Sequence, residues 1–308
     1  STSATADVKV NFGSTAASSA YREGAWSTKQ GFPRAISFYE ERLTFGGATQ
    51  TPQRLDGSLS GVYEEFTPGV LDDDPVSFTV ASGRMNAILW LEAGRWLMLG
   101  TAGGEFRAGA TDEDPVTPSN FNTKTETPWG SANVSPVPVS SVVLFVQRGK
   151  RKVREFSFIL ETGAFIAQDL TILSEHFFVP GKTISEMAFQ KEPDPILWVI
   201  RSDGMLAGLT YDRAQDVVGW HRHTTGPAQD FTDGKFESVS IIPHPDGDRD
   251  QVWFVVNRVV NGATKRFVEF FEDAGVFYED QHVDSGLTYS GAAVLTVSGL
   301  SHLNGATV

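Results

Sequence analysis

The stretch Ile196-Leu197-Trp198-Val199-Ile200, followed by Ser202-Asp203-Gly204 and by Leu206-Ala207-Gly208-Leu209-Thr210-Tyr211, decides how this chain is expected to fold. Asp-Gly between two runs rich in apolar and aromatic residues is a strong short-range signal for a β-hairpin, because this pair readily adopts the backbone angles of a tight turn. The stretch therefore predicts two antiparallel strands joined at Asp203-Gly204.

Apolar runs of the same kind return along the chain. With Leu43, Leu97, Leu144, Leu197 and Trp253 as markers, the steps between runs are 54, 47, 53 and 56 residues. A repeat of this length, holding several strands, has the size of one blade of a β-propeller. We therefore expect an all-β fold, a β-propeller of about five to seven small antiparallel blades, with strands of a truncated additional β domain at the ends.

The pattern divides the chain into three parts. Residues 1–20 are rich in Ser, Thr and Ala, and are predicted to be an entering strand and linker from a preceding domain. Residues 21–284 are predicted to form the propeller domain. Because the repeat ends near Ser285, residues 285–308 are predicted to be the start of a further, truncated β domain.

Several segments between the marker runs carry more local expectations. Residues 111–138 hold five of the fifteen prolines and are predicted to be an irregular loop. Asp169 to Phe178 places apolar residues near one helical face, so a short helix is expected there. Leu55 to Leu59 and Val62 to Phe66 are expected to be short strands.

The composition argues against several classes of function. The 308 residues are 40% hydrophobic, and 25 Lys and Arg stand against 38 Asp and Glu, a formal net charge of −13. Tight binding to the DNA backbone or to an anionic membrane depends on cations, so this balance disfavours both. The lack of cysteine excludes disulfides, thiolate catalysis and Cys-type zinc sites. We find no apolar run long enough to span a bilayer and no signal-peptide pattern at the first residues.

Four segments contain groups that bind metal ions in other proteins: Asp72-Asp73-Asp74, Asp112-Glu113-Asp114, Asp246-Gly247-Asp248-Arg249-Asp250 and His221-Arg222-His223. The acidic segments lack the ligand spacing of a calcium loop, so turns exposed to solvent explain them better. The two imidazoles could bind zinc from one face of a strand, but the only further ligand in view is His244, through the fold. Polar side chains on an outer strand are the favoured interpretation.

No arrangement of residues indicates catalysis. A nucleophile elbow and a phosphate-binding loop are both missing, and the Gly-rich segment Gly100-Thr101-Ala102-Gly103-Gly104 joins strands instead of opening a helix. The pair Glu64-Glu65 would point to opposite faces of a strand, which does not suit a glycosidase. We therefore expect a protein that is not an enzyme, and we assign no catalytic, cofactor-binding or metal residues and no cofactor.

The run Arg148-Gly149-Lys150-Arg151-Lys152-Val153-Arg154 is the one cationic cluster in the sequence. It is interpreted either as one solvated hairpin or as a patch that touches nucleic acid or an acidic partner. Within an assembly, contact with a neighbouring subunit is favoured slightly over contact with DNA.

Further residues resemble a known family. The opening segments are Trp26-Ser27, Gly31-Phe32-Pro33-Arg34-Ala35 and Phe38-Tyr39-Glu40-Glu41-Arg42-Leu43-Thr44-Phe45-Gly46-Gly47. The later segments are Pro52-Gln53, Ser58-Leu59-Ser60-Gly61, Gly100 to Phe106, Leu144 to Gly149, Lys152 to Glu155, Asp169 to His176, Arg201 to Gly204, Gly208 to Asp212 and Asn261 to Thr264. In this order they resemble the tail nozzle, or tail tubular, proteins of short-tailed bacteriophages and prophages, over roughly Trp26 to Val308.

The resemblance implies a structural protein of the virion tail that is assembled in the host bacterial cytoplasm. It implies a ring of six subunits below the portal and adaptor, which docks to the adaptor and other tail proteins and not to a membrane. The genome would pass through the central channel during ejection without specific binding. Because the chain is acidic, we expect acidic residues to line that channel.

Two other classes of function stay open. One is a carbohydrate-binding or depolymerising propeller for the host surface, which an aromatic pocket with paired acids would mark. The other is an intracellular interaction scaffold.

Overall fold

The computed structural model describes residues 24–80, 86–110, 114–225, 234–260, 262–271, 291–296 and 298. The predicted linker at residues 1–20 lies outside the described residues, and so does most of the predicted further domain at residues 285–308. Within that domain, the described residues 291–296 form no strand.

The described residues form five consecutive antiparallel sheets, four of them four-stranded and the last three-stranded. The first sheet contains β1 (Ala35–Tyr39), β2 (Arg42–Gly46), β3 (Arg54–Gly57) and β4 (Val76–Thr79), and the second contains β5 (Ile88–Ala93), β6 (Leu97–Thr101), β7 (Gly104–Ala110) and β8 (Phe121–Thr127). The third contains β9 (Val137–Val139), β10 (Val142–Val146), β11 (Val153–Ile159) and β12 (Ala164–Asp169), and the fourth contains β13 (Ile184–Gln190), β14 (Ile196–Arg201), β15 (Leu206–Asp212) and β16 (Val217–His223). The fifth contains β17 (Gly234–Pro243), β18 (Asp250–Val260) and β19 (Ala263–Phe270). In every sheet the strands pair in chain order, as in the blades of a β-propeller, so the predicted fold class is confirmed.

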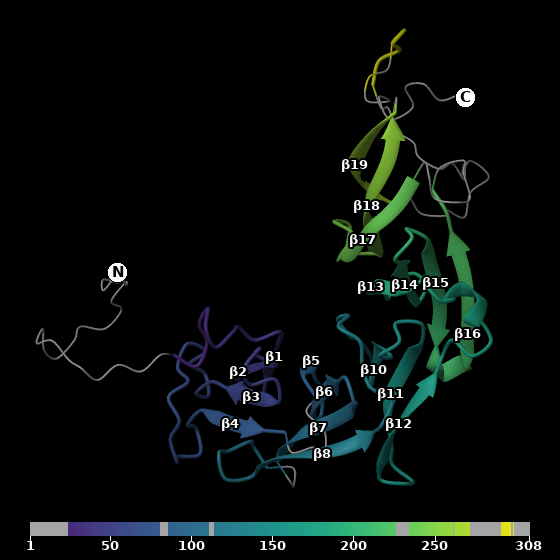
Figure 1. The fold of residues 1–308 in the computed structure, drawn as a ribbon. Coiled ribbons are helices and arrows are strands. Elements are labelled where there is room, and N and C mark those ends of the chain that lie inside the picture. The colour runs from purple at the N-terminus through teal and green to yellow at the C-terminus, as the bar shows by residue number, and fades with distance from the viewer. Residues whose placement is uncertain are drawn as a thin grey trace, which may run out of the picture.

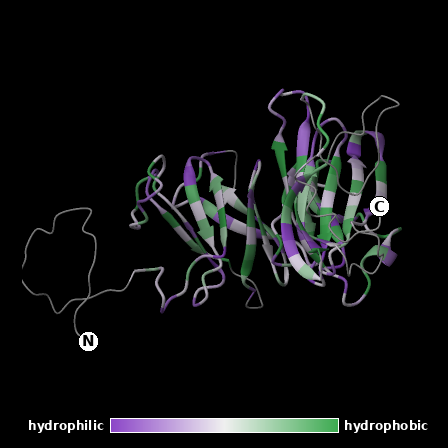
Figure 2. Cartoon of the chain, turned by 90° about the horizontal axis from the view of Figure 1, so that it is seen from above, coloured by the Kyte–Doolittle hydropathy of each residue, from purple (hydrophilic) through white to green (hydrophobic). Residues whose placement is uncertain are grey.

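The five sheets stand side by side in an arc (Figure 1). In the first, second and fourth sheets the first strand, β1, β5 or β13, lies on the concave side and the later strands follow outward, and β9 and β17 contact β13. The arc is open between the first sheet and the fifth. In the view turned by 90° from Figure 1, the strands run between two rims at which the chain turns (Figure 2).

The marker residues of the sequence repeat fall at equivalent places. Leu43, Leu97, Leu144, Leu197 and Trp253 lie in β2, β6, β10, β14 and β18, which are the second strands of the five sheets. The predicted hairpin is also present, because β14 pairs with β15 around a turn in which Gly204 has a φ of +98°. The repeat therefore reflects one strand position that recurs once in each sheet.

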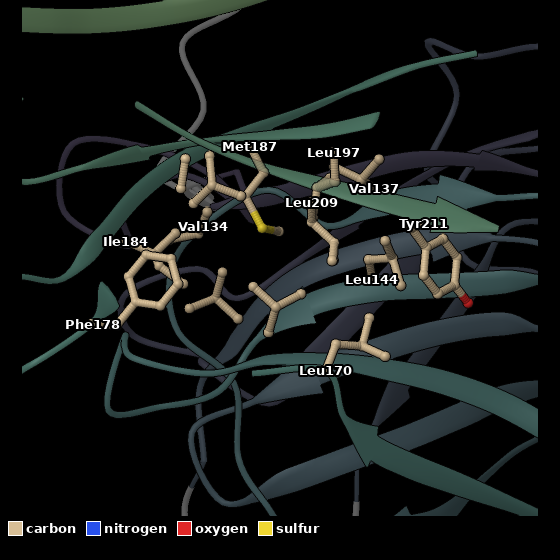
Figure 3. Close-up of a cluster of buried hydrophobic side chains, with 14 of the residues drawn as sticks. Val134, Val137, Leu144, Leu170, Phe178, Ile184, Met187, Leu197, Leu209 and Tyr211 are labelled. Carbon is tan, nitrogen blue, oxygen red and sulfur yellow. The ribbon is translucent and has the colours of Figure 1, made fainter. Parts of the chain in front are cut away.

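The hydrophobic core is divided into layers, one between each pair of neighbouring sheets. The largest layer packs the third sheet on the fourth, and Figure 3 shows Leu144 and Val137 facing Ile184, Leu197 and other side chains of that layer. Full burial of one such side chain stabilises a fold by about 1.5–3 kcal/mol. Each sheet is thus held mainly by its neighbours along the arc.

Backbone hydrogen bonds repeat these contacts at one rim. In each of the first four sheets, a carbonyl in or beside the turn between the second and third strands accepts the N–H of a residue in the next sheet or in the connection leading to it. The donor and acceptor pairs are Ile88 to Pro52 at 2.9 Å, Ser131 to Thr101 at 2.7 Å, Ile184 to Lys150 at 2.8 Å and Phe236 to Gly204 at 3.0 Å. We call these four bonds the clips, and they fix each turn to the sheet that follows.

Three local expectations were wrong. The segment at Asp169 to Phe178 forms turns and one 3₁₀ helix, Glu175–Phe177, because its backbone N–H groups donate to carbonyls three residues back, as Phe178 does to Glu175, and not four residues back as in an α-helix. Residues 121–127, inside the expected loop, form β8, since this Thr-rich stretch has no proline and pairs with β7. Val62 to Phe66 forms a loop with one isolated bridge, and the fourth strand comes later, at Val76–Thr79.

Candidate functional site

The meander topology sends alternate turns to opposite rims of the arc. We call one the basic rim: it holds the turns between second and third strands and the connections from one sheet to the next. Its described residues are 24–34, 47–53, 80, 86–87, 102–103, 128–136, 147–152, 170–183, 202–205, 224–225 and 262. The acidic rim holds the remaining turns, at residues 40–41, 58–75, 94–96, 114–120, 140–141, 160–163, 191–195, 213–216 and 244–249.

Cations predominate among the charged residues on the basic rim. The described cations there are Lys29, Arg34, Arg148, Lys150, Arg151, Lys152 and Lys182. The described acids there are Glu175 and Asp203, and Asp169 ends the neighbouring strand β12. In a chain of net charge −13, this rim is therefore a surface of the opposite sign.

The acidic rim shows the reverse. Its described acids are Glu40, Glu41, Glu64, Glu65, Asp72, Asp73, Asp74, Asp114, Glu161, Glu192, Asp194, Asp216, Asp246 and Asp248. Its described cations are Arg95, Lys191, Arg213 and Arg249. The negative surplus of the chain is thus concentrated at one end of the strands.

The predicted cationic run is split by the fold. Arg148, Lys150 and Arg151 are exposed at the turn between β10 and β11, whereas Arg154 is buried. Arg154 donates to the Ala167 carbonyl at 2.6 Å and to Gln147 at 2.8 Å. It also lies over the ring of Trp129, 3.7 Å from its centroid. Only part of the run therefore faces solvent.

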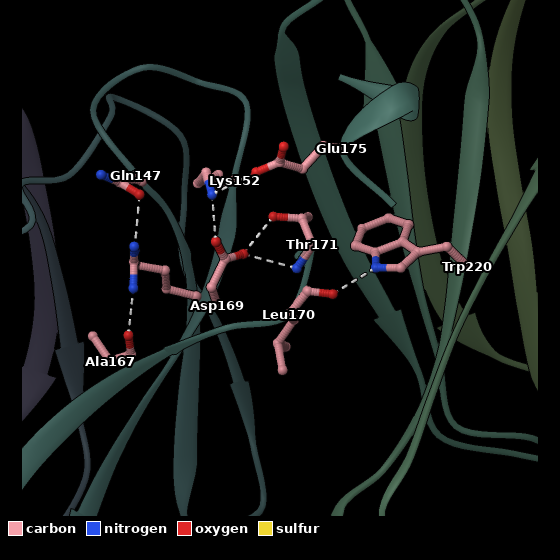
Figure 4. A network of polar contacts seen from close by, with 9 residues as sticks. Gln147, Lys152, Ala167, Asp169, Leu170, Thr171, Glu175 and Trp220 are labelled. Carbon is pink, nitrogen blue, oxygen red and sulfur yellow. Dashed lines mark hydrogen bonds and ion pairs between the residues drawn. The ribbon is translucent and has the colours of Figure 1, made fainter. Parts of the chain in front are cut away.

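Lys152 takes part in a polar network below the same turn (Figure 4). Its ammonium lies 2.6 Å from Asp169 and 3.0 Å from Glu175, and these hydrogen bonds raise the pKa of Lys152. Burial alone would raise the pKa of Asp169, but hydrogen bonds from Lys152 and Thr171 outweigh it and lower that pKa. Trp220 of β16 donates to the Leu170 carbonyl at 2.8 Å, which ties the network to the fourth sheet.

The acidic segment Asp72-Asp73-Asp74 surrounds a buried arginine through its backbone. The guanidinium of Arg42 donates to carbonyl oxygens, which belong to Ser58, Asp72, Asp73, Asp74 and Val116. One carboxylate oxygen of Asp74 accepts the N–H of Leu71 at 2.7 Å. The main chain of this loop thus encloses a protein cation. Of the second acidic segment, Asp112-Glu113-Asp114, only Asp114 lies within the described residues.

The loop from His244 to Asp250 is the tip of the hairpin between β17 and β18. Asp248 forms an ion pair with Arg249 at 2.9 Å. A carboxylate oxygen of Asp250 accepts the N–H of Lys191 at 2.7 Å, in the neighbouring sheet. Over the described ranges, no group of three or more His, Asp or Glu side chains is placed to hold a metal ion.

His221 and His223 lie between the fourth and fifth sheets, near the basic rim. His221 Nδ1 and His223 Nε2 are 2.8 Å apart, so one ring donates to the other. Trp198 and Phe271 pack on the ring of His223, with centroids 5.2 and 5.7 Å away. Burial, followed by the neighbouring His221, lowers the pKa of His223 to about 4. Sequence reasoning expected these residues on an outer strand, and β16 is the outermost of its sheet, but the pair is packed between sheets.

The other acidic candidates lie apart. Glu64 and Glu65 are in the loop between β3 and β4, where Glu65 accepts the N–H of Thr67 at 2.7 Å. Glu105 follows the Gly-rich turn and is buried. It accepts hydrogen bonds from Thr127 at 2.5 Å and Ser131 at 2.9 Å. Burial raises the pKa of Glu105 against the opposing effect of those two hydroxyls.

Few charges lie on the first strands of the five sheets. The described strands β1, β5, β9, β13 and β17 carry Glu92, Glu186 and Glu237, together with Lys235. Burial raises the pKa of Glu92 to about 7, so this group is only partly ionised near neutrality. The acidic surplus therefore lies on the acidic rim and is not concentrated on these strands.

Comparisons with known proteins found similarity to solved structures but no similarity by sequence. We found no matching family model and no characterised relative by sequence. Among solved structures, an auxiliary nutrient binding protein from Bacteroides thetaiotaomicron is 12% identical, with a TM-score of 0.41 over 80% of this chain and 58% of that one. The Pan2 WD40 domain of Neurospora crassa is 10% identical, with a TM-score of 0.42 over 79% and 63%.

A putative 6-phosphogluconolactonase from Bacteroides fragilis is 11% identical, with a TM-score of 0.42 over 79% of this chain and 74% of that one. The chain thus spans about three-fifths of the length of the first two structures. At these scores the likenesses carry no argument about function, and the fold class rests on the sheet topology. Among the described helices, none has the length and apolar character needed to cross a membrane.

Proposed function

We propose that this chain is a structural component of a bacteriophage tail, of the nozzle or tubular type, and that it works by docking to neighbouring tail proteins. The observation that carries the proposal is the separation of charge between its two rims. A component of an ordered assembly has to present a specific surface to each neighbour, and surfaces of opposite charge select partners and suppress wrong ones.

The residues behind the family resemblance have structural roles that suit this proposal. Trp26, Phe45 and Phe66 pack together, with Trp26 in contact with both phenyl rings at 4.9 Å between centroids. Gly31 has a φ of +84°, and a side chain there would meet Thr49 within 2.6 Å. Arg42 holds the acidic loop. These residues build the first sheet and its loops, which is what a rigid wall component requires.

The test is to delete the gene from its phage or prophage and to complement it with the wild-type chain carrying an epitope tag. We expect particles without the protein to lose infectivity while their heads still assemble, and antibody against the tag to label the tail of complemented particles in electron micrographs. Wild-type infectivity after deletion, or label away from the tail, would contradict the proposal.

The same purified protein separates this proposal from the carbohydrate-binding alternative. A glycan array probed with the tagged chain should show no binding above that of a tagged control protein. Binding of a defined glycan, combined with unlabelled tails, would favour the host-surface function instead.

A further inference from the structure

We propose that the basic rim of one copy of this chain binds the acidic rim of a second copy. This inference rests on the proposed function, because it names the surfaces through which subunits of a tail ring would meet. A contact between two different surfaces of the same chain is heterologous, and it closes into a ring when the rotation between copies returns on itself.

The turn between β10 and β11 presents the cations of the basic rim in a fixed geometry. Arg148 donates its N–H to the Gly130 carbonyl at 2.8 Å, and the Lys150 carbonyl accepts the N–H of Ile184 at 2.8 Å. The connection from the second sheet to the third, at Gly130, and the start of the fourth sheet, at Ile184, are therefore both hydrogen-bonded to this turn. Because Arg148, Lys150 and Arg151 are exposed on an ordered backbone, little backbone ordering remains to oppose binding by a partner.

The fourth and fifth sheets present carboxylates on the acidic rim in a similarly fixed way. Within the hairpin tip, His244 donates its N–H to the Arg249 carbonyl at 2.8 Å, and Gly247 donates to the His244 carbonyl at 2.8 Å. Asp246 and Asp248 stand on this tip with side chains 75% and 61% exposed. Asp194, in the adjacent turn, is also exposed.

A second copy fits the basic rim better than a nucleic acid does. Asp169, Glu175 and Asp203 lie among the cations, so the rim is not a continuous cationic track for phosphates. The net charge of −13 also opposes the approach of a polyanion. The acidic rim of another copy, in contrast, has turns at the same sheet spacing and the opposite sign, because both rims belong to the same five sheets.

The experiment reverses the charge of each rim separately and then of both together. The basic-rim variant is Arg148→Glu, Lys150→Glu and Arg151→Glu, and the acidic-rim variant is Asp194→Lys, Asp246→Lys and Asp248→Lys. The control is Lys124→Glu, which changes an exposed cation at the middle of the outer strand β8, away from both rims. Sedimentation velocity at low and high salt measures association, and circular dichroism confirms that each variant is folded.

We expect the wild-type chain and the control to associate at low salt and to dissociate as salt rises. Each rim variant should associate at least about tenfold more weakly, since surface complementarity of charge is lost. The variant with all six rim substitutions should regain association, because the turn between β10 and β11 and the acidic turns of the fourth and fifth sheets then carry reversed and again opposite charges. A structural defect would not be repaired by further substitutions on the other rim.

Three results would overturn the inference. Association that is unchanged in both rim variants would place the interface elsewhere and leave the proposed tail function standing. A wild-type chain that stays monomeric at high concentration and low salt would remove the rim contact altogether, while infectivity of the deletion strain still decides the tail function. Binding of a fluorescent 30-bp DNA duplex that only the basic-rim variant loses, with association unchanged, would assign that rim to nucleic acid.

Discussion

The two rims of the arc differ in how their charged residues are used. On the basic rim, Lys152 is engaged by carboxylates, while Arg148 and Lys150 point to solvent from a clipped turn. At the acidic rim, carboxylates such as those of Asp74 and Asp250 accept backbone N–H groups of the long loops. Acidic side chains therefore help to build the loops of one rim, and backbone clips hold the turns of the other. The charge separation follows from this difference in turn chemistry.

The largest expected effect comes from the cation buried beneath the acidic rim. Arg42→Met leaves several carbonyl oxygens of the loop without their donor, and each buried group left unsatisfied costs about 1–3 kcal/mol. Urea denaturation followed by tryptophan fluorescence measures the free energy of unfolding. The matched variant Arg148→Met, on the basic rim, should change it by less than about 0.5 kcal/mol, because this side chain is exposed. Equal effects would remove the distinction between the two cations.

Substitution of one glycine on each rim tests how closely the neighbouring atoms are packed there. Gly204, in a clipped turn, has a φ of +98°, and a Cβ there would lie 2.5 Å from the Cβ of Lys235. Gly247, on the acidic rim, has a φ of +73° with open space around it. We expect Gly204→Ala to cost about 2–3 kcal/mol and Gly247→Ala about 1–2 kcal/mol, since both share the left-handed backbone and only the first meets a neighbour. Thermal unfolding of both variants gives the ranking, and a larger loss for Gly247→Ala would contradict the clip model.

The histidine pair should make the basic-rim end of the last two sheets sensitive to acid. His223 has a pKa of about 4 in the folded chain against about 6.5 when unfolded, so its neutral form is favoured by folding. This contribution is fully present above pH 6.5 and is lost as the pH falls toward 4, to an extent of order 2 kcal/mol. In His223→Phe the free energy of unfolding should fall less over that range than in the wild type. If the free energy of unfolding falls equally with pH in His223→Phe and in the wild type, the histidine pair does not cause the acid sensitivity.

The smallest expected effect concerns the exposed carboxylates of the acidic rim. Asp248→Asn removes one ion pair with Arg249 at the surface, and such pairs contribute about 0–1 kcal/mol. We expect the free energy of unfolding to change by less than about 0.5 kcal/mol. A stability loss of several kcal/mol at this position would mean that the carboxylate serves the fold and not a partner.

The strand repeat was predictable because its physical causes are local. Leu197 belongs to an apolar run that is buried on both faces of β14, Trp253 belongs to a run in which buried and half-buried residues alternate, and Asp203-Gly204 meets the backbone needs of a tight turn. Strand β8 was missed because its residues Phe121–Thr127 are mostly polar and form the outer edge of a sheet, where pairing with β7 and not apolar pattern decides the conformation. The burial of Arg154 was missed for a similar reason, since only the fold brings Trp129 and Ala167 around it.

The rims themselves could have been found from the sequence. In a meander, successive turns lie at alternate ends, so assigning the turns in order separates Arg148 and Lys150 from Glu40 and Asp248. Counting net charge over the whole chain hid this pattern. The expectation of an acidic channel came from that total.

The most direct test of the account is a cross-link between the two rims. The chain has no cysteine, so single substitutions report on one contact at a time. A chain carrying Lys150→Cys is mixed with one carrying Asp248→Cys and oxidised at low salt, with Lys124→Cys, at the middle of β8, in place of Lys150→Cys as the control. We expect a disulfide-linked dimer that contains one chain of each kind and forms faster than the control dimer. A mixed dimer no more abundant than the control would contradict the claim that opposite rims join the subunits.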